Sequence, residues 1–314
     1  MGLTRIQFLQ KKNTLPNPQI AYYHLPGLFE FTDFYRVFLP LFREHREYFY
    51  SWCDIGSIYG APADCLWGGG RVGFGDADPD EFFRLTEEYG ISARLTFSNS
   101  LLRPEHLSDK KCNALCRLFS KASVPGGVIV HSDLLLEYLK ENYPELYFVS
   151  STTKVLTSFD ALDQETERKE FRYVVPDFRF NNDFSHLKML DYGQREKVEL
   201  LCNECCDVDC PDRKQCYETV SRKSLGEDCP EHICRGANAA RGYRFSDAMR
   251  SPAFIGVSAI RNTYLPMGFS HFKIEGRSLG SALLLEFILY YMTKPAYRLR
   301  VREEIYLDNT LDLF

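Results

Sequence analysis

The sequence has no apolar segment long enough to cross a membrane. Its most apolar stretch, SALLLEFILYYMT from Ser281, is shorter than the roughly 20 residues that a membrane-spanning helix needs, and it contains Glu286. The N-terminal MGLTRIQFLQKKN lacks the apolar core of a signal peptide, and Ile6 departs from the myristoylation pattern. We therefore expect a cytoplasmic protein with no membrane partner.

The sequence also lacks an excess of positive charge. Its 314 residues include 38 Lys and Arg against 43 Asp and Glu, which gives a formal net charge of -5. Proteins that bind nucleic acid usually carry a basic patch or stripe, so nucleic acid is not favoured as a partner.

Several catalytic signatures are missing. We find no HExxH helix and no Ser/His/Asp order, so a metal-independent hydrolase has little support. The radical-SAM spacing C-x3-C-x2-C fails, because Asp209 stands where the third cysteine would follow Cys202 and Cys206. WGGGRVGFG, from Trp67, matches neither phosphate-binding glycine pattern, and we expect a flexible loop that brings Arg71 near a ligand.

What the sequence does contain is a series of short apolar runs with helical patterns between them. Such runs are typical of parallel strands that are buried on both faces. The eight runs begin at Ala21, Asp54, Ala93, Gly127, Leu146, Tyr173, Val198 and His271. This alternation predicts a (β/α)8 TIM-like barrel, with an open doubly wound sheet as the alternative. We expect one domain over 1–314 that ends in a helix and extension over 278–314.

Cysteines crowd into a polar segment after the seventh predicted strand. Seven of the eleven lie between Cys202 and Cys234, inside an insertion at about 202–250. In a reducing compartment, clustered cysteines are more often metal ligands than disulfides. The predicted ligands are four of the following: Cys206, Cys210, Cys216, Cys229 and Cys234. Cys210 is followed by proline, as in iron–sulfur ligand loops, but four thiolates, or three with His232, also suit zinc.

Polar residues cluster where the predicted strands end, and TIM-barrel active sites lie at the carboxyl ends of strands. The catalytic candidates are Glu204, His131, Lys273 and Glu275. The candidates for binding a small organic substrate are Asn99, Asp177, Arg179, Arg277 and Tyr59. The cations favour an anionic substrate. The alternative is an ion-pair network inside the barrel that only supports the fold.

HFKIEGR, from His271, resembles the last barrel strand of the peptidase U32 family, which ends in a lysine-isoleucine-glutamate-glycine-arginine signature. VELLCNECC stands where that family carries its cysteine motif, and SSTT from Ser150 and SIYG from Ser57 resemble earlier strand ends. The resemblance covers residues 20 to 300 and implies a TIM-like barrel with a [4Fe–4S] cluster on four cysteines. The compact spacing Cys206-x3-Cys210-x5-Cys216-x12-Cys229 indicates a divergent member.

The resemblance also implies a function. U32-type proteins include an oxygen-independent ubiquinone hydroxylase pair and enzymes that hydroxylate RNA bases. We therefore expect an iron–sulfur enzyme that hydroxylates an organic substrate without oxygen or tailors it by related redox chemistry. The alternative is a non-catalytic or paired subunit with a homologous protein partner, whose cluster or zinc ion is structural.

Overall fold

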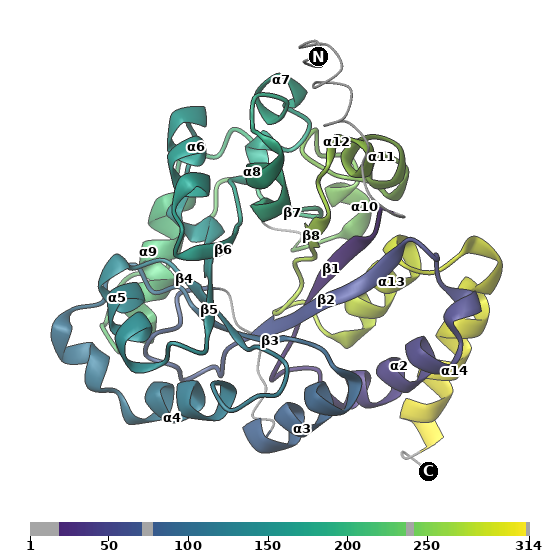
Figure 1. The fold of residues 1–314 in the computed structure, drawn as a ribbon, viewed down its shortest axis with the longest axis horizontal. Coiled ribbons are helices and arrows are strands. Elements are labelled where there is room, and N and C mark those ends of the chain that lie inside the picture. The colour runs from purple at the N-terminus through teal and green to yellow at the C-terminus, as the bar shows by residue number, and fades with distance from the viewer. Residues whose placement is uncertain (1–18, 71–77, 237–241, 312–314) are drawn as a thin grey trace, which may run out of the picture.

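Eight parallel strands form the centre of the computed structural model, which describes residues 19–70, 78–236 and 242–311 (Figure 1). The strands are β1 (Ala21–Pro26), β2 (Cys53–Gly60), β3 (Ala93–Phe97), β4 (Gly127–Val130), β5 (Tyr147–Ser150), β6 (Phe171–Val174), β7 (Glu199–Leu201) and β8 (His271–Lys273). They pair in the order β6-β5-β4-β3-β2-β1-β8-β7, and a parallel bridge between Val174 and Val198 closes the ring. The predicted (β/α)8 barrel is confirmed, and each predicted run contributes a strand.

Helices surround the barrel on its outside (Figure 1). Those before the insertion are α2 (Thr32–Glu44), α3 (Pro79–Tyr89), α4 (Lys110–Phe119), α5 (Asp133–Asn142), α6 (Phe159–Glu167), α7 (Phe184–Leu187) and α8 (Tyr192–Lys197). The later ones are α9 (Arg213–Ser224), α10 (Phe245–Ala248), α11 (Val257–Ala259), α12 (Leu265–Met267), α13 (Ser281–Tyr291) and α14 (Arg298–Leu311). Among the residues described, no helix has both the length and the apolarity of a membrane span.

The helix boundaries follow from capping residues in the sequence. The Asp78 side chain accepts a hydrogen bond from the Asp80 amide at the start of α3, and Pro79 occupies the first turn, where no amide is required. The same helix ends at Gly90, whose left-handed backbone (φ 65°) favours glycine. Pro40 lies inside α2 without ending it. Between β6 and β7 the chain forms two short helices, α7 and α8.

The interior of the barrel is charged. Glu199 on β7 accepts hydrogen bonds from Arg94 on β3 at 2.5 Å and from Lys273 on β8 at 3.3 Å. His24 Nε2 lies 3.4 Å from the same carboxylate and 3.1 Å from His271 Nδ1. Burial alone would raise the pKa of Glu199, but the charges of Arg94 and Lys273 hold it well below its ordinary value. The carboxylate therefore stays ionised at the centre of the barrel.

The cysteine-rich insertion lies across the carboxyl end of the barrel. After β7 the chain reaches α9, which contacts the segment that follows β3. There the Ser100 amide donates to Ser221 Oγ at 3.1 Å, and Asn99 Nδ2 donates to the Ser221 carbonyl at 3.1 Å. The insertion thus covers the end of the barrel at which active sites of this fold lie.

Four segments for which we stated expectations lie outside the described ranges. They are the N-terminal segment 1–18, the glycine-rich residues 71–77 with Arg71, residues 237–241 of the insertion, and the end of the C-terminal extension, 312–314.

Candidate functional site

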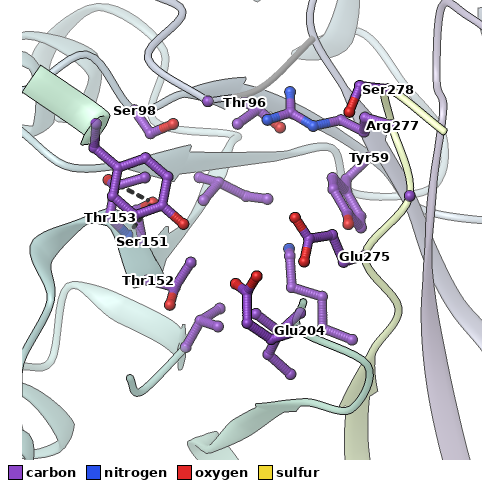
Figure 2. Close-up of a pocket in the computed structure, with 17 residues that line it drawn as sticks. Tyr59, Thr96, Ser98, Ser151, Thr152, Thr153, Glu204, Glu275, Arg277 and Ser278 are labelled. Atoms are coloured by element: carbon purple, nitrogen blue, oxygen red, sulfur yellow. Dashed lines mark hydrogen bonds between the residues drawn. The ribbon is translucent and has the colours of Figure 1, made fainter. Parts of the chain in front are cut away.

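A cavity opens at the carboxyl ends of the strands (Figure 2). Strand ends and the segments that follow them supply most of its walls, and Tyr217 of α9 adds a side chain from the insertion. Its empty volume is about 600 Å³ including the open mouth. The cavity contains five predicted site residues: Tyr59, Glu204, Lys273, Glu275 and Arg277.

Lys273 lines this cavity as a buried cation. Its Nζ lies 3.6 Å from the centre of the Tyr59 ring and 3.3 Å from Glu199 Oε1. Burial lowers the pKa of Lys273 to about 8, and the anionic Glu199 opposes this effect only in part. Tyr59 is itself fixed, because its hydroxyl donates to the Ile274 carbonyl at 2.6 Å.

Polar atoms without a partner gather in the same cavity. Thr96 Oγ1, Ser98 Oγ and Arg277 Nη1 are buried and have no hydrogen-bond partner within the described part of the chain. All three residues line the cavity, and in Figure 2 they lie along one side of it. Buried polar groups normally have partners, so three unsatisfied groups around one cavity indicate a binding site for a polar ligand.

Glu204 and Glu275 occupy the other side of the cavity in Figure 2. Their carboxylates and the Cys205 thiol lie within 4.8 Å of one another, which is close enough for one metal ion. Glu204 Oε1 accepts hydrogen bonds from the Cys205 and Cys206 amides at 2.9 and 3.0 Å. Glu204 therefore connects the barrel cavity to the start of the cysteine-rich insertion.

A second cavity lies on the insertion side of Glu204. Its lining includes five thiols and an imidazole, from Cys205, Cys206, Cys210, Cys216, Cys234 and His232. Arg244 and Arg250 also line it, which places positive charge beside the thiols. The lining does not include Cys229, whose Sγ lies 3.9 Å from the Thr219 carbonyl. Of the predicted ligands, the structure thus gathers Cys206, Cys210, Cys216 and Cys234 around one space.

Two predicted substrate-binding residues instead hold the insertion in place. Arg179 donates from Nε to the Val208 carbonyl and from Nη2 to the Cys210 carbonyl, both at 2.6 Å. Its Nη1 also contacts Asp177 Oδ1 at 3.3 Å. Asp177 and Arg179 do not line the barrel cavity, and their contacts orient the loop that carries the cysteines.

Asn99 and His131 also lie outside the cavity lining. Asn99 donates to the carbonyls of Leu66 and Ser221, so it joins the segment after β2 to α9. His131 Nδ1 lies 2.9 Å from the Thr153 hydroxyl, and Thr153 does line the cavity. Burial, with the nearby cation Lys154, lowers the pKa of His131 to about 4, so the ring is neutral at pH 7.

Arg213 is a site residue that the sequence analysis did not identify. It is buried at the start of α9, where its Nη2 donates to Glu204 Oε2 at 2.6 Å and its Nε lies 3.5 Å from Asp177 Oδ2. The guanidinium also lies over the Phe178 and Tyr217 rings. The signal in the sequence was weak, because an arginine in a polar, cysteine-rich loop is expected to be solvated.

Comparison with solved structures gives a similar fold. The structure of the U32 peptidase Mk0906 matches with a TM-score of 0.51, over 84% of this chain and 96% of that chain, at 15% sequence identity. This likeness supports the barrel architecture expected from the U32 resemblance. Comparisons with protein-family models and with curated proteins found no match.

Proposed function

We propose that this chain is a divergent U32-type enzyme in which a metal cluster in the insertion works on a small organic molecule held in the barrel cavity. The observation that carries the proposal is the position of Glu204, which lines both cavities. One wall therefore separates the space surrounded by thiols from the space that holds unsatisfied polar groups. The reaction that we propose is oxygen-independent hydroxylation or a related redox change of the bound molecule.

The donor set around the second cavity fits an iron–sulfur cluster. Cys206, Cys210, Cys216 and Cys234 would supply four thiolates, as a [4Fe–4S] cluster requires. A cluster with four thiolates carries net negative charge, and the arginines in the lining would offset it. Such a cluster, when bound, supplies one-electron transfer at the edge of the barrel cavity. Zinc is the alternative metal, because thiolates and an imidazole are also the ligands that it prefers.

The residues of the barrel cavity would bind and orient the substrate. Arg277, with the Thr96 and Ser98 hydroxyls, offers donors to an anionic group of the substrate. Tyr217 of α9 closes part of the opening and would exclude water from the bound molecule. The Arg213 ion pair would keep α9, and with it Tyr217, in place.

The test is an anaerobic purification followed by an absorption spectrum and analysis of iron, sulfide and zinc. We expect about four irons and four sulfides per chain and a broad band near ~400 nm that dithionite bleaches. Each of four single serine variants should have a strongly reduced iron content. The substituted residues are Cys206, Cys210, Cys216 and Cys234. Cys229→Ser is the matched control and should retain its iron. One zinc without iron would reject the cluster.

A paired, non-catalytic subunit is the second candidate function. The observation that favours it is Ile233, whose side chain is 81% exposed beside the exposed Cys234. Met249, at the edge of the second cavity, adds another exposed apolar side chain. Activity that appears only after a homologous protein is added, and that Ile233→Ser abolishes without loss of metal, would favour this role.

A further inference from the structure

Lys273 has the surroundings of a reactive amine. The residue is only 6% exposed, yet it lines the barrel cavity, so a bound ligand can reach it while bulk water is limited. Glu199 at 3.3 Å is its ion-pair partner, but this carboxylate is also bonded to Arg94 at the shorter distance of 2.5 Å. Like charges on Arg94 and Arg277 disfavour the ammonium form.

Lys273 is therefore deprotonated more readily than an exposed lysine. Burial lowers its pKa to about 8, below the ordinary value of a lysine. A desolvated lysine of this kind is the usual nucleophile toward carbonyl carbons. The Tyr59 ring beneath the Nζ restricts the direction from which a carbonyl group can approach.

The same cavity provides a site for an anionic group. Arg277 Nη1 and the hydroxyl oxygens of Thr96 and Ser98 are buried without partners among the residues described. Arg277 and Lys273 both lie against the Tyr59 ring, with the Arg277 Cζ 5.9 Å from its centre. Both residues line the same cavity. A guanidinium binds a carboxylate through two parallel hydrogen bonds, so a carboxylate is the anion that fits best.

We propose that Lys273 forms an imine with a small 2-oxo acid whose carboxylate is bound by Arg277. The neutral Nζ attacks the carbonyl carbon and forms the new carbon–nitrogen bond. The carbonyl oxygen takes up two protons, both of which come from the attacking nitrogen, and leaves as water, so that a neutral carbon–nitrogen double bond remains. No oxidant or reductant is consumed. Glu275 lines the same cavity (Figure 2), and its carboxylate would relay these protons. This inference rests on the proposed function only in using the barrel cavity as the substrate site.

The test is reductive trapping on the full metal-loaded chain. The protein is incubated anaerobically with pyruvate and sodium cyanoborohydride, and labelled peptides are quantified by mass spectrometry. We expect the reduced adduct at Lys273 to form at least ~10-fold faster than at the exposed Lys188, because a larger fraction of its amine is neutral. Labelling at Lys273 that is no faster than at Lys188 would overturn the proposal.

Arg277→Gln provides the second measurement. Loss of one charged hydrogen-bond donor should reduce trapping of pyruvate at Lys273 by ~10-fold or more, and trapping of the uncharged acetaldehyde should stay the same. An equal loss for both compounds, or no loss for either, would contradict the carboxylate site. Lys273→Met should lose the label at this position while its circular dichroism spectrum stays unchanged.

Metal content measured in the same samples separates this inference from the proposed function. A label at Lys273 in protein without metal supports the imine and counts against the cluster enzyme. A full cluster without any label at Lys273 supports the cluster and overturns the imine.

Discussion

At the scale of single residues, the barrel depends on one buried carboxylate. Glu199 is fully buried and lies within 3.4 Å of Arg94, Lys273 and His24. Removing one member of a buried ion pair leaves the other charge buried without a partner. The resulting loss of stability is larger than the net stability that the intact pair contributes. The charged network and the ligand site are therefore joined at Lys273.

We predict that Glu199→Gln lowers the free energy of unfolding by about 3–5 kcal/mol, because the buried guanidinium of Arg94 loses its counter-charge. Urea denaturation monitored by circular dichroism measures the change. Glu137→Gln removes the exposed pair with Lys140 and should change stability by about 0–1 kcal/mol. Equal effects of the two substitutions would show that the ion pairs inside the barrel contribute little to the free energy of unfolding.

The pH dependence of stability should reflect two buried histidines. Burial and Arg94 lower the pKa of His24 well below 6.5, and burial lowers the pKa of His271 to about 4. The unfolded chain binds protons more readily than the folded chain, so stability is complete above pH 6.5 and falls as the pH is lowered toward 4.

We expect these two histidines to account for a loss of about 2–4 kcal/mol between pH 6.5 and 5, because each neutral histidine contributes up to about 1.4 kcal/mol per pH unit. His131, whose pKa burial lowers to about 4, adds to the loss in the same direction. Glu199, whose pKa is held low, loses its stabilising effect in the same direction but at still lower pH. Urea midpoints at pH 7, 6 and 5 measure the slope. His271→Gln should reduce it, and an unchanged slope would exclude this histidine as a cause.

At the scale of elements, α9 determines the shape of both cavities. Its buried residues are Arg213, Tyr217 and Ser221, which recur every four positions and face the barrel. Each has a polar group, so the helix has no apolar stripe, and the periodicity that reveals an amphipathic helix is missing. The sequence therefore predicted a cysteine loop in this region and gave no indication of a helix across the mouth.

We predict that Arg213→Met releases α9 from the barrel, because Glu204 and Asp177 each lose their contact with this buried cation. Amide hydrogen exchange in residues 213–224 should become at least ~10-fold faster. Arg222→Gln is the matched control, because Arg222 is also on α9 and its exposed ion pair is with Glu227, beyond the end of the helix. Equal protection in both variants would mean that Arg213 does not anchor the helix.

The segment after β2 offers a second test at this scale. A Cβ added at Gly69 would collide with the backbone of Ser98 and Asn99, whereas one added at Gly70 would meet only the flexible end of Arg277. Gly69→Ala should therefore lower the melting temperature by several degrees, since the backbone cannot yield easily. Gly70→Ala should leave melting nearly unchanged and weaken trapping of pyruvate at Lys273. Thermal unfolding and the trapping assay distinguish the two.

At the scale of the whole molecule, the sequence predicted the barrel because each strand is a short apolar run with turn or cap residues around it. It also led us to look for candidate residues at the carboxyl ends of the strands, and the structure has a cavity at that end. It did not separate the residues that line the cavity, such as Lys273 and Arg277, from those that anchor the insertion, such as Asp177 and Arg179. That distinction depends on where α9 crosses the barrel, and long-range packing decides this path.

The separation of barrel and insertion leads to a final prediction about metal removal. The main hydrophobic core contains Cys53, Cys65, Cys112, Cys116 and Cys202, whereas the thiols around the second cavity are partly or fully exposed. A metal bound by the latter group would stabilise the insertion and leave the barrel core unaffected. Treatment with a chelator in air should then speed amide exchange in residues 205–236 by ~10-fold or more, while exchange in β1 to β5 stays slow.

The barrel cavity should respond as well, because Glu204 lines both cavities and Tyr217 extends from α9 of the insertion into the barrel cavity. We therefore expect the pyruvate adduct at Lys273 to form less selectively after metal loss, at a rate closer to that of the exposed Lys188. Cys229→Ser protein, treated in the same way, should behave like the wild type. Cooperative unfolding of the entire chain on chelation would instead show that the cysteines hold the barrel together, and the two regions would have to be regarded as a single folding unit.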